Sequence, residues 1–249
     1  MNQNQSDEVY IYDGSLSGFY CCVFESVYSR SVPGVILPEG EGQMCIFNQK
    51  NIPTDQEKAA RVRASIPGKI SNRALELVES VFLSCLKEKE MALLKFLLLG
   101  YKEGRRVDQM ISHPDANPIF AAERNMTGEA HLLTGFVRFA DYGNGLAATI
   151  TPKNFVLPFL ARHFIDRFPK EDFLIFDKTH KAALVYQGGK AEIIPVDEMT
   201  LPEIPPEEAK YQALWKSFYN TIAIEARYNP KCRMTHMPKR YWGNMTEFN

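Results

Sequence analysis

The segment Gly135-Phe-Val-Arg-Phe-Ala-Asp-Tyr-Gly-Asn-Gly-Leu-Ala-Ala-Thr-Ile-Thr151 marks the point where the pattern of the chain changes. Two short runs of strand-forming residues, 136–140 and 146–151, flank the glycine-rich residues 141–145. This arrangement is typical of a β-hairpin. Before the hairpin the apolar residues recur mainly at helical spacing, and after it they gather in short strands. A change of this kind within one chain favours the α+β class over a wound parallel sheet.

The residues before the hairpin predict a mainly helical half that starts with a short strand at 9–12. The run 91–101 is apolar almost all round, which is typical of a central, buried helix. A second strand is expected at Met44–Phe47. A capping box at Thr54–Glu57 predicts a helix that ends before Pro67. Further helices are expected at 16–28, from about 71 to 85, and from 117 to 133.

The residues after the hairpin predict a mostly antiparallel sheet. Strands are expected at 173–176, 181–186 and 190–194, and a helix at about 158–168 precedes them. We therefore predict a single α+β domain over residues 1–249. Its parts are a helix-rich region (1–134), a sheet-rich region (135–195), an acidic, proline-rich connector (195–206), and a C-terminal helix with a basic tail (207–249).

The C-terminal helix, expected at Glu207–Arg227, carries an apolar stripe that we predict to be buried. This stripe comprises Tyr211, Leu214, Trp215, Phe218 and Ile222.

The basic tail, Arg227–Trp242, is the strongest local signal in the sequence. Cations supply phosphate contacts and flat rings supply stacking surfaces, so single-stranded or distorted nucleic acid is a natural partner. The alternative is that the rings pack on the core and that the acidic connector neutralises the cations. The predicted nucleic-acid contacts are Arg227, Lys231, Arg233, Lys239, Arg240, Tyr241 and Trp242.

Composition excludes several classes of protein. The net charge is −1, so binding of a polyanion would need local segregation of charge. The five cysteines form no C-x-x-C pair, and no metal or cofactor is predicted. Adjacent Cys21 and Cys22 are expected to be small core residues. The polar N-terminus indicates no signal peptide, and the longest apolar run is too short to cross a bilayer, so we expect a cytoplasmic protein.

Three histidine-centred candidates for acid–base chemistry remain. Asp177 and His180 bracket a short turn and could orient each other, although a local hydrogen bond also explains that spacing. His163 lies on a predicted helix and could instead be the polar tip of an apolar face. The sequence has no phosphate-binding glycine motif, serine elbow or zinc-deaminase signature. It leaves open whether the protein is an enzyme.

Six stretches give the chain a resemblance that spans nearly its whole length. They are Tyr10–Ser15, Lys58–Val62, Leu97–Tyr101, Gly135–Phe139, Leu157–Phe164 and Met237–Trp242. With them the chain resembles a bacterial family described as "probable DNA metabolism protein", which is encoded beside a radical SAM protein of DNA repair or modification. Some members look fused to a uracil-DNA glycosylase domain, for which the residues up to Asn249 leave no room. The resemblance implies no catalytic residues.

Three functions remain open. The first is a nucleic-acid-binding accessory of a radical SAM partner, acting through the basic tail. The second is a glycosylase-like or hydrolase-like enzyme that acts on damaged DNA, with His163 or the Asp177–His180 pair as acid or base. The third is a protein–protein scaffold whose aromatic tail docks on the radical SAM protein.

Overall fold

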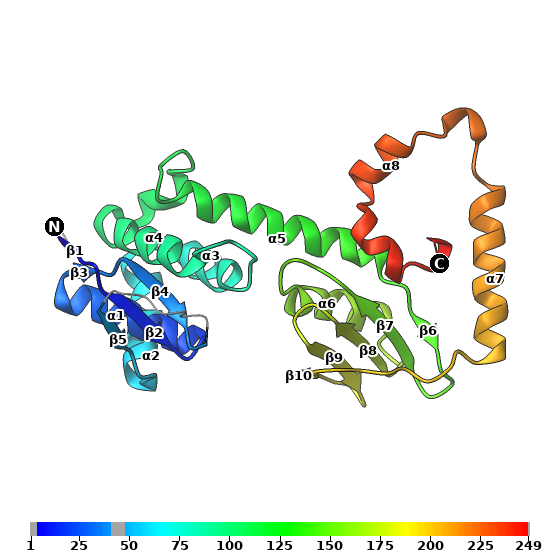
Figure 1. Ribbon diagram of the computed structural model, residues 1–249, viewed down its shortest axis with the longest axis horizontal. Helices are drawn as coiled ribbons and strands as arrows, with labels where there is room; N and C mark the ends of the chain where they lie inside the picture. Colours follow the sequence, from blue (N-terminus) through cyan, green and yellow to red (C-terminus); the bar gives the residue numbers. More distant parts are fainter. Residues whose placement is uncertain (1–3, 41–47, 249) are drawn as a thin grey trace. The chain divides into compact units, whose positions relative to one another are not determined.

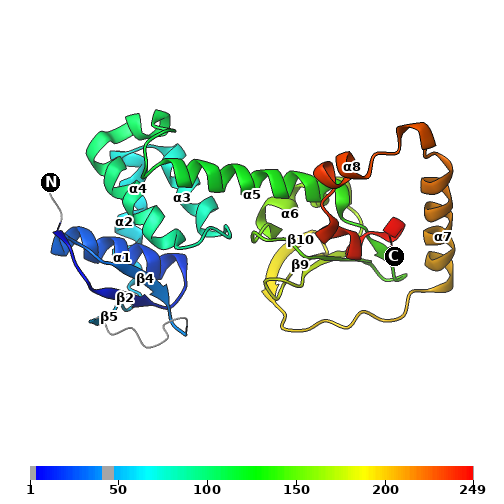
Figure 2. The same cartoon turned by 45° about the horizontal axis from the view of Figure 1, so that its top comes forward.

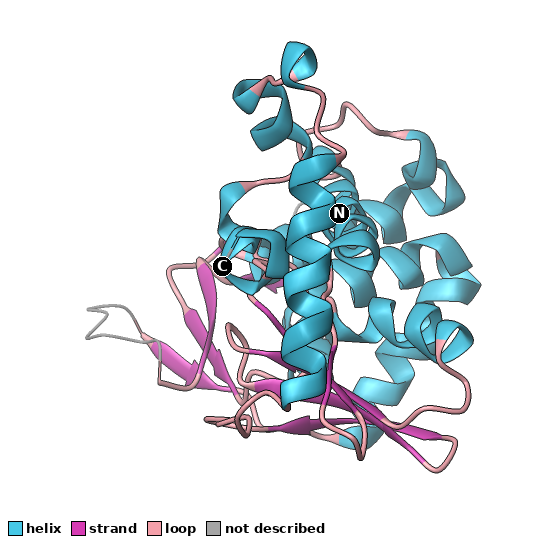
Figure 3. Cartoon of the chain, turned by 90° about the vertical axis from the view of Figure 1, so that its right-hand side faces the viewer, coloured by secondary structure: helices cyan, strands magenta, loops and turns pink. Residues whose placement is uncertain are grey.

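The computed structural model describes residues 4–40 and 48–248 of the chain. It divides into two compact units, Met1–Met126 and Thr127–Asn249, and the boundary falls within helix α5 (Asn117–Phe136). The first unit is mostly helical, and the second contains the larger sheet (Figure 1, Figure 3). The predicted α+β class is therefore confirmed. That the units form one domain stays a prediction.

The first unit contains a three-stranded parallel sheet with β2 (Val9–Tyr12) at its centre. It pairs with β4 (Val35–Pro38) on one side and with β5 (Gln49–Asn51) on the other. Parallel neighbours need a crossover connection, which α1 (Leu16–Ser29) provides between β2 and β4. Of these strands the sequence predicted β2 alone. The other predicted strand, Met44–Phe47, lies outside the described residues.

Helix α2 (Gln56–Lys69) differs from its prediction at both ends. Asp55 caps it by accepting two backbone N–H groups of the first turn. Thr54, the predicted cap, instead donates its hydroxyl to the Asp13 carboxylate at 2.7 Å. The predicted end before Pro67 is also wrong, because this proline lies in the last turn, where its missing N–H costs a single hydrogen bond.

The core of the first unit gathers around α4 (Lys89–Glu103), which is the central, buried helix that the sequence predicts. Leu93, Leu94 and Phe96 are fully buried in it. Gly100 lets a neighbour approach closely, since a Cβ atom there would lie 2.7 Å from the Cδ1 atom of Ile70. The remaining elements of this unit are β1 (Asn4–Gln5), β3 (Ser31–Val32), α3 (Asn72–Phe82) and the 3-10 helix η1 (Gly104–Gln109).

The second unit contains a five-stranded mixed sheet in the order β10-β9-β8-β7-β6. Only the β7–β8 pair is parallel among the described strands of this sheet, because α6 (Leu157–Arg167) crosses between these two strands. Gly188 and Gly189 both have positive φ in the tight turn that the sequence predicts between β9 and β10. The strands are β6 (Ala140–Asp141), β7 (Leu146–Ile150), β8 (Phe173–Asp177), β9 (Ala182–Gln187) and β10 (Lys190–Pro195).

A cluster of aromatic rings packs α6 against the sheet. Phe139 makes edge-to-face contacts with Phe164, Phe168 and Phe173, with ring centres 5.2, 5.3 and 5.9 Å apart. Such contacts stabilise a core beyond the area that they bury. They also hold the chain just after α5 next to α6, where a cavity described below begins.

The C-terminal segment, residues 206–248, begins after a connector without regular structure that follows β10 (Figure 2). Its first helix, α7 (Pro206–Thr221), ends six residues before the predicted end. The predicted burial of its apolar stripe is wrong: Tyr211 is 67% exposed, Leu214 64% and Phe218 53%. The segment continues with η2 (Glu225–Arg227), α8 (Pro230–His236), η3 (Lys239–Asn244) and η4 (Thr246–Phe248).

None of the helices within 4–40 and 48–248 combines the length and the apolar character that crossing a membrane requires.

Candidate nucleic-acid interface

A buried carboxylate on α5 holds the end of the basic tail, and we call it the Glu129 anchor. Glu129 is 4% exposed and accepts the hydroxyl of Tyr241 at 2.6 Å and the Nη2 of Arg240 at 2.7 Å. The backbone N–H groups of Lys153 and Asn154 donate to it at 3.0 and 2.8 Å. Arg240 is therefore paired within the protein. Tyr241 is 2% exposed and does not present its ring to a base.

These contacts also set the ionisation of the anchor. Burial by itself would raise the pKa of Glu129, but the hydrogen bonds from Tyr241 and from the backbone of Lys153 and Asn154 outweigh it, so the pKa lies below its usual value. Burial and the hydrogen bond to Glu129 raise the pKa of the Tyr241 hydroxyl. At neutral pH the anchor is thus a charged carboxylate that accepts a bond from a neutral phenol.

A second carboxylate, Glu247, connects the C-terminal turn to α7 and to the chain after α5. It accepts two bonds from the guanidinium of Arg138, at 2.7 and 3.1 Å, and one from the Nε1 of Trp215 at 3.2 Å. The side chain of Glu247 is 1% exposed. Burial opposes its ionisation, but the bonds from Arg138 and the backbone keep its pKa below the usual value. Arg138 is accordingly not a free cation.

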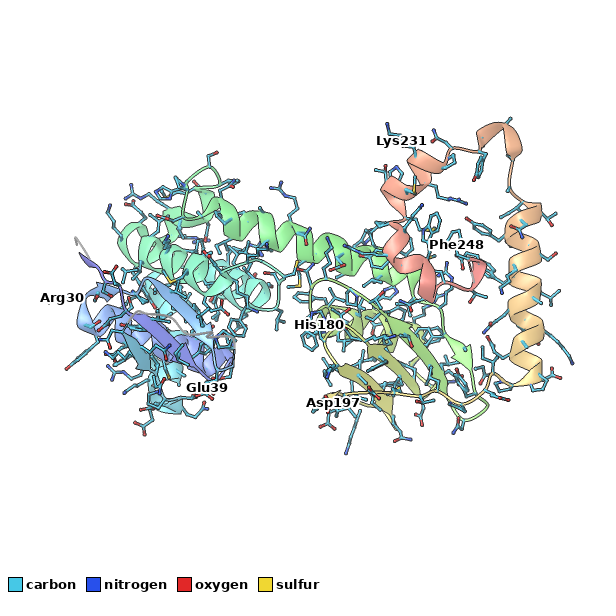
Figure 4. All side chains as sticks on the ribbon, in the orientation of Figure 1. Arg30, Glu39, His180, Asp197, Lys231 and Phe248 are labelled. Carbon is cyan, nitrogen blue, oxygen red and sulfur yellow. The ribbon has the colours of Figure 1, made fainter. Side chains whose placement is uncertain are left out.

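Four of the predicted contact residues are exposed at the surface: Arg240, which pairs with Glu129, and three that form no ion pair with any described side chain. Arg227, Lys231 and Lys239 are exposed, and among the side chains that the structure describes they form no ion pair. Figure 4 labels Lys231 on α8, where its side chain points outward. The prediction that the tail presents several cations thus has a structural basis for three of its members.

Arg233 and Trp242 form a stacked group inside the segment. The guanidinium of Arg233 lies 5.0 Å from the ring centre of Trp242 and 5.5 Å from that of Phe248. The rings of Trp242 and Phe248 stack at 4.4 Å. The Nε1 of Trp242 donates to the carbonyl of Met237 at 3.0 Å. This group fixes the shape of the tail, and Trp242 is only partly exposed.

The acidic connector does not neutralise the tail in this structure. Asp197, labelled in Figure 4, pairs with Lys181 at 3.4 Å. Glu207 pairs with Lys210 at 3.1 Å within α7. Among the described side chains no ion pair joins the connector to the tail. The alternative interpretation of the tail therefore finds support in the Glu129 anchor but not in the connector.

A cavity of about 630 Å³ opens between α6 and α7. Phe164 and Phe168 line it from α6, and Tyr211 and Trp215 line it from α7. Arg167 also contributes, and among the described side chains it forms no ion pair. The volume lies within the range of small-molecule sites. The sequence missed this cavity because it placed the α7 rings in a buried stripe.

The predicted acid–base candidates lie apart from the exposed cations of the tail in the sequence and in their contacts. Asp177, at the end of β8, is fully buried, and its carboxylate lies 2.6 Å from the Nδ1 of His180. It also accepts the backbone N–H groups of Thr179 and His180, which is how a turn is closed. His163 is exposed on α6 with its ring against Phe164. A catalytic role for any of them stays a prediction.

Within the described parts of the chain, no three His, Cys, Asp or Glu side chains gather as metal ligands would. A family model with the description "Domain of unknown function (DUF4130)" matches residues 87–247, more than half of the chain. The matched residues include α4, the Glu129 anchor, the five-stranded sheet of the second unit and the C-terminal segment. No curated protein matches the chain.

Proposed function

The chain belongs to the family of the domain of unknown function DUF4130, and we propose that it is a nucleic-acid-binding accessory protein of DNA repair or modification. The C-terminal segment binds single-stranded or distorted DNA. The resemblance to DNA metabolism proteins supplies the process, and it also suggests a radical SAM protein as the partner.

The observation that carries this proposal is the set of exposed cations Arg227, Lys231 and Lys239. They lie within thirteen residues of one another on a tail, Arg227–Trp242, in which Arg233 and Arg240 are held in internal contacts. Lysine and arginine groups at a surface bind phosphate and release counterions, which makes affinity depend on salt. The chain as a whole is nearly neutral, so this local excess is what a polyanion would find.

Exposed rings on the same segment supply the second half of a single-strand site. Tyr211 and Tyr228 are each 67% exposed, and Trp215 is 40% exposed beside the cavity. Bases stack on such rings with little regard to sequence, at about 1–3 kcal/mol per base. In this proposal the stacking role passes from Tyr241 and Trp242 to the rings of α7 and to Tyr228.

A salt series on a fluorescent single-stranded oligonucleotide tests the proposal through its anisotropy. The variant is the triple substitution Arg227→Ala, Lys231→Ala and Lys239→Ala. For single strands the slope of log K against log salt is about −0.7 per neutralised phosphate. Loss of three contacts should therefore reduce the magnitude of the slope by about 2.

The matched control removes the same charge elsewhere in the second unit. Lys170, Lys178 and Lys190 are exposed and form no ion pair among the described side chains. Their triple substitution to Ala should leave the slope close to that of the parent. Equal slopes for the two triple variants, or no binding by the parent protein, would overturn the proposal.

The exposed stripe of α7 favours a second function, a scaffold that binds another protein. Leu214 is 64% exposed and Ile222 57% exposed, and large contiguous apolar patches mark protein interaction sites. The two functions share the exposed stripe, because Tyr211 and Trp215 stack on bases in the first and lie beside Leu214 in the second. The salt series separates them, since apolar docking does not follow counterion release.

A further inference from the structure

The first unit contains a groove of about 990 Å³ that has no role in the proposed function. Residues of α1, α2 and α4 line it, and its floor is apolar. Val27 and Val62 contribute from α1 and α2, and Leu98 and Leu99 contribute from α4. Its volume is at the upper end of the range for ligand sites. The groove could not be predicted from the sequence, because its walls come from three separate helices.

Four cations surround this apolar floor: Arg61, Lys69, Lys95 and Lys102. Among the described side chains, Arg61, Lys69 and Lys95 form no ion pair, and Lys102 has only a 3.9 Å contact with Glu103. Asp115 is the single carboxylate among the described lining residues. The groove therefore carries a local positive charge on a nearly neutral chain, and its ligand should be an anion.

Flat rings accompany these cations. Phe24 and Tyr28 lie one turn apart on α1 and stack with their centres 6.0 Å apart and their planes 9° from parallel. The guanidinium of Arg61 lies 5.5 Å from the centre of the Phe24 ring. Tyr28 is 78% exposed, so the stack ends in a ring that another flat group can cover. Tyr101 lines the groove as well, with its hydroxyl 2.7 Å from that of Ser65.

We infer that this groove is a second binding site for single-stranded nucleic acid. Phosphates would contact the cations on the rim, and a base would extend the Phe24–Tyr28 stack. An acidic amphipathic helix would also match an apolar floor with a basic rim. The parallel ring pair, which ends in the exposed Tyr28, favours the polynucleotide, because a base can extend the stack whereas a helix needs only the aliphatic floor. This site is independent of the C-terminal segment, so either can fail alone.

The test measures binding of the same single-stranded oligonucleotide to the full chain by anisotropy. Tyr28→Ala removes the end of the stack and should weaken binding about 5- to 150-fold. The double substitution Lys69→Ala and Lys95→Ala should reduce the magnitude of the salt slope by about 1.4. All three side chains are exposed, so unchanged circular dichroism and melting are expected.

The matched control is Lys87→Ala with Arg105→Ala, two exposed cations of the same unit outside the groove. This pair should leave affinity and slope unchanged. Each substitution is also combined with the triple variant Arg227→Ala, Lys231→Ala and Lys239→Ala. In this background the anisotropy measures binding of the oligonucleotide to the groove without the cations of the tail. Parent-like binding by both groove variants would overturn the inference. The inference would also be overturned if the groove substitutions abolished binding of an acidic amphipathic peptide but left binding of the oligonucleotide unchanged.

Discussion

Helices α4 and α7 are both rich in large apolar residues, yet one is the centre of a core and the other is exposed. Helix α4 packs against α2, α3, η1 and β4 and buries most of its apolar side chains. Helix α7 buries none, and its main neighbour is the short turn η4. An apolar stripe predicts that a helix face needs a partner. The comparison shows that an apolar stripe in the sequence does not decide whether the rest of the chain covers it.

The two regions are also held by different forces. The first unit relies on apolar burial around α4. In the C-terminal segment Tyr241 and Met245 are the buried apolar side chains among those described, and two buried carboxylates hold the segment in place. Glu129 binds Tyr241 and Arg240, and Glu247 binds Trp215. The contrast yields three predictions.

The largest effect is expected for Glu129→Ala, which leaves the donors around the anchor unpaired. Each buried donor that loses its acceptor costs about 1–3 kcal/mol, and the Tyr241 hydroxyl and the Asn154 N–H both lose Glu129. Trp215 and Trp242 are the two tryptophans of the chain and both lie in the C-terminal segment, so their fluorescence reports this region. We expect the unfolding transition of the C-terminal segment in Glu129→Ala to shift to a lower denaturant concentration. An exposed control, Glu198→Ala, should unfold like the parent, and a parent-like curve for Glu129→Ala would contradict the role of the anchor.

The second prediction compares the two helices directly. Leu97→Ala in α4 removes a fully buried side chain and should lower the free energy of unfolding by about 2–5 kcal/mol. Leu214→Ala in α7 removes an exposed one and should change it by no more than about 0.5 kcal/mol. Denaturation followed by circular dichroism measures both. A large loss for Leu214→Ala would mean that another chain covers α7 in solution.

The smallest effect concerns pH. The pKa of Glu129 is lowered below its ordinary value of 4.5, so its contribution to stability is complete above about pH 4.5 and is lost as the pH falls through the lower folded value. Glu247 changes in the same direction. Tryptophan fluorescence should therefore show acid loosening of the C-terminal segment. In Glu129→Ala the part of this pH dependence that comes from the anchor should disappear, and an identical acid profile would refute the assignment.

Elements with a strong local signal were predictable. The helix at Leu16–Ser29, the buried helix around Leu94 and the hairpin at Gly188–Gly189 each follow from spacing or turn chemistry over a few residues. The gathering of cations such as Lys231 and Lys239 near the C-terminus also followed from the sequence. The role of Arg240 and Tyr241 did not, because their partner Glu129 is 111 and 112 residues away.

By itself the sequence determined the fold class, most α-helices, strand β2 and strands β7 to β10, and the presence of cations near the C-terminus, since these depend on periodicity, local backbone preference and composition. The tertiary structure alone decided which apolar faces are covered, which cations are already paired, and where rings and charges meet in a groove. These properties depend on contacts between residues far apart in the chain. Spacing along a sequence carries no record of such contacts, and burial and charge pairing exist only once the elements have packed.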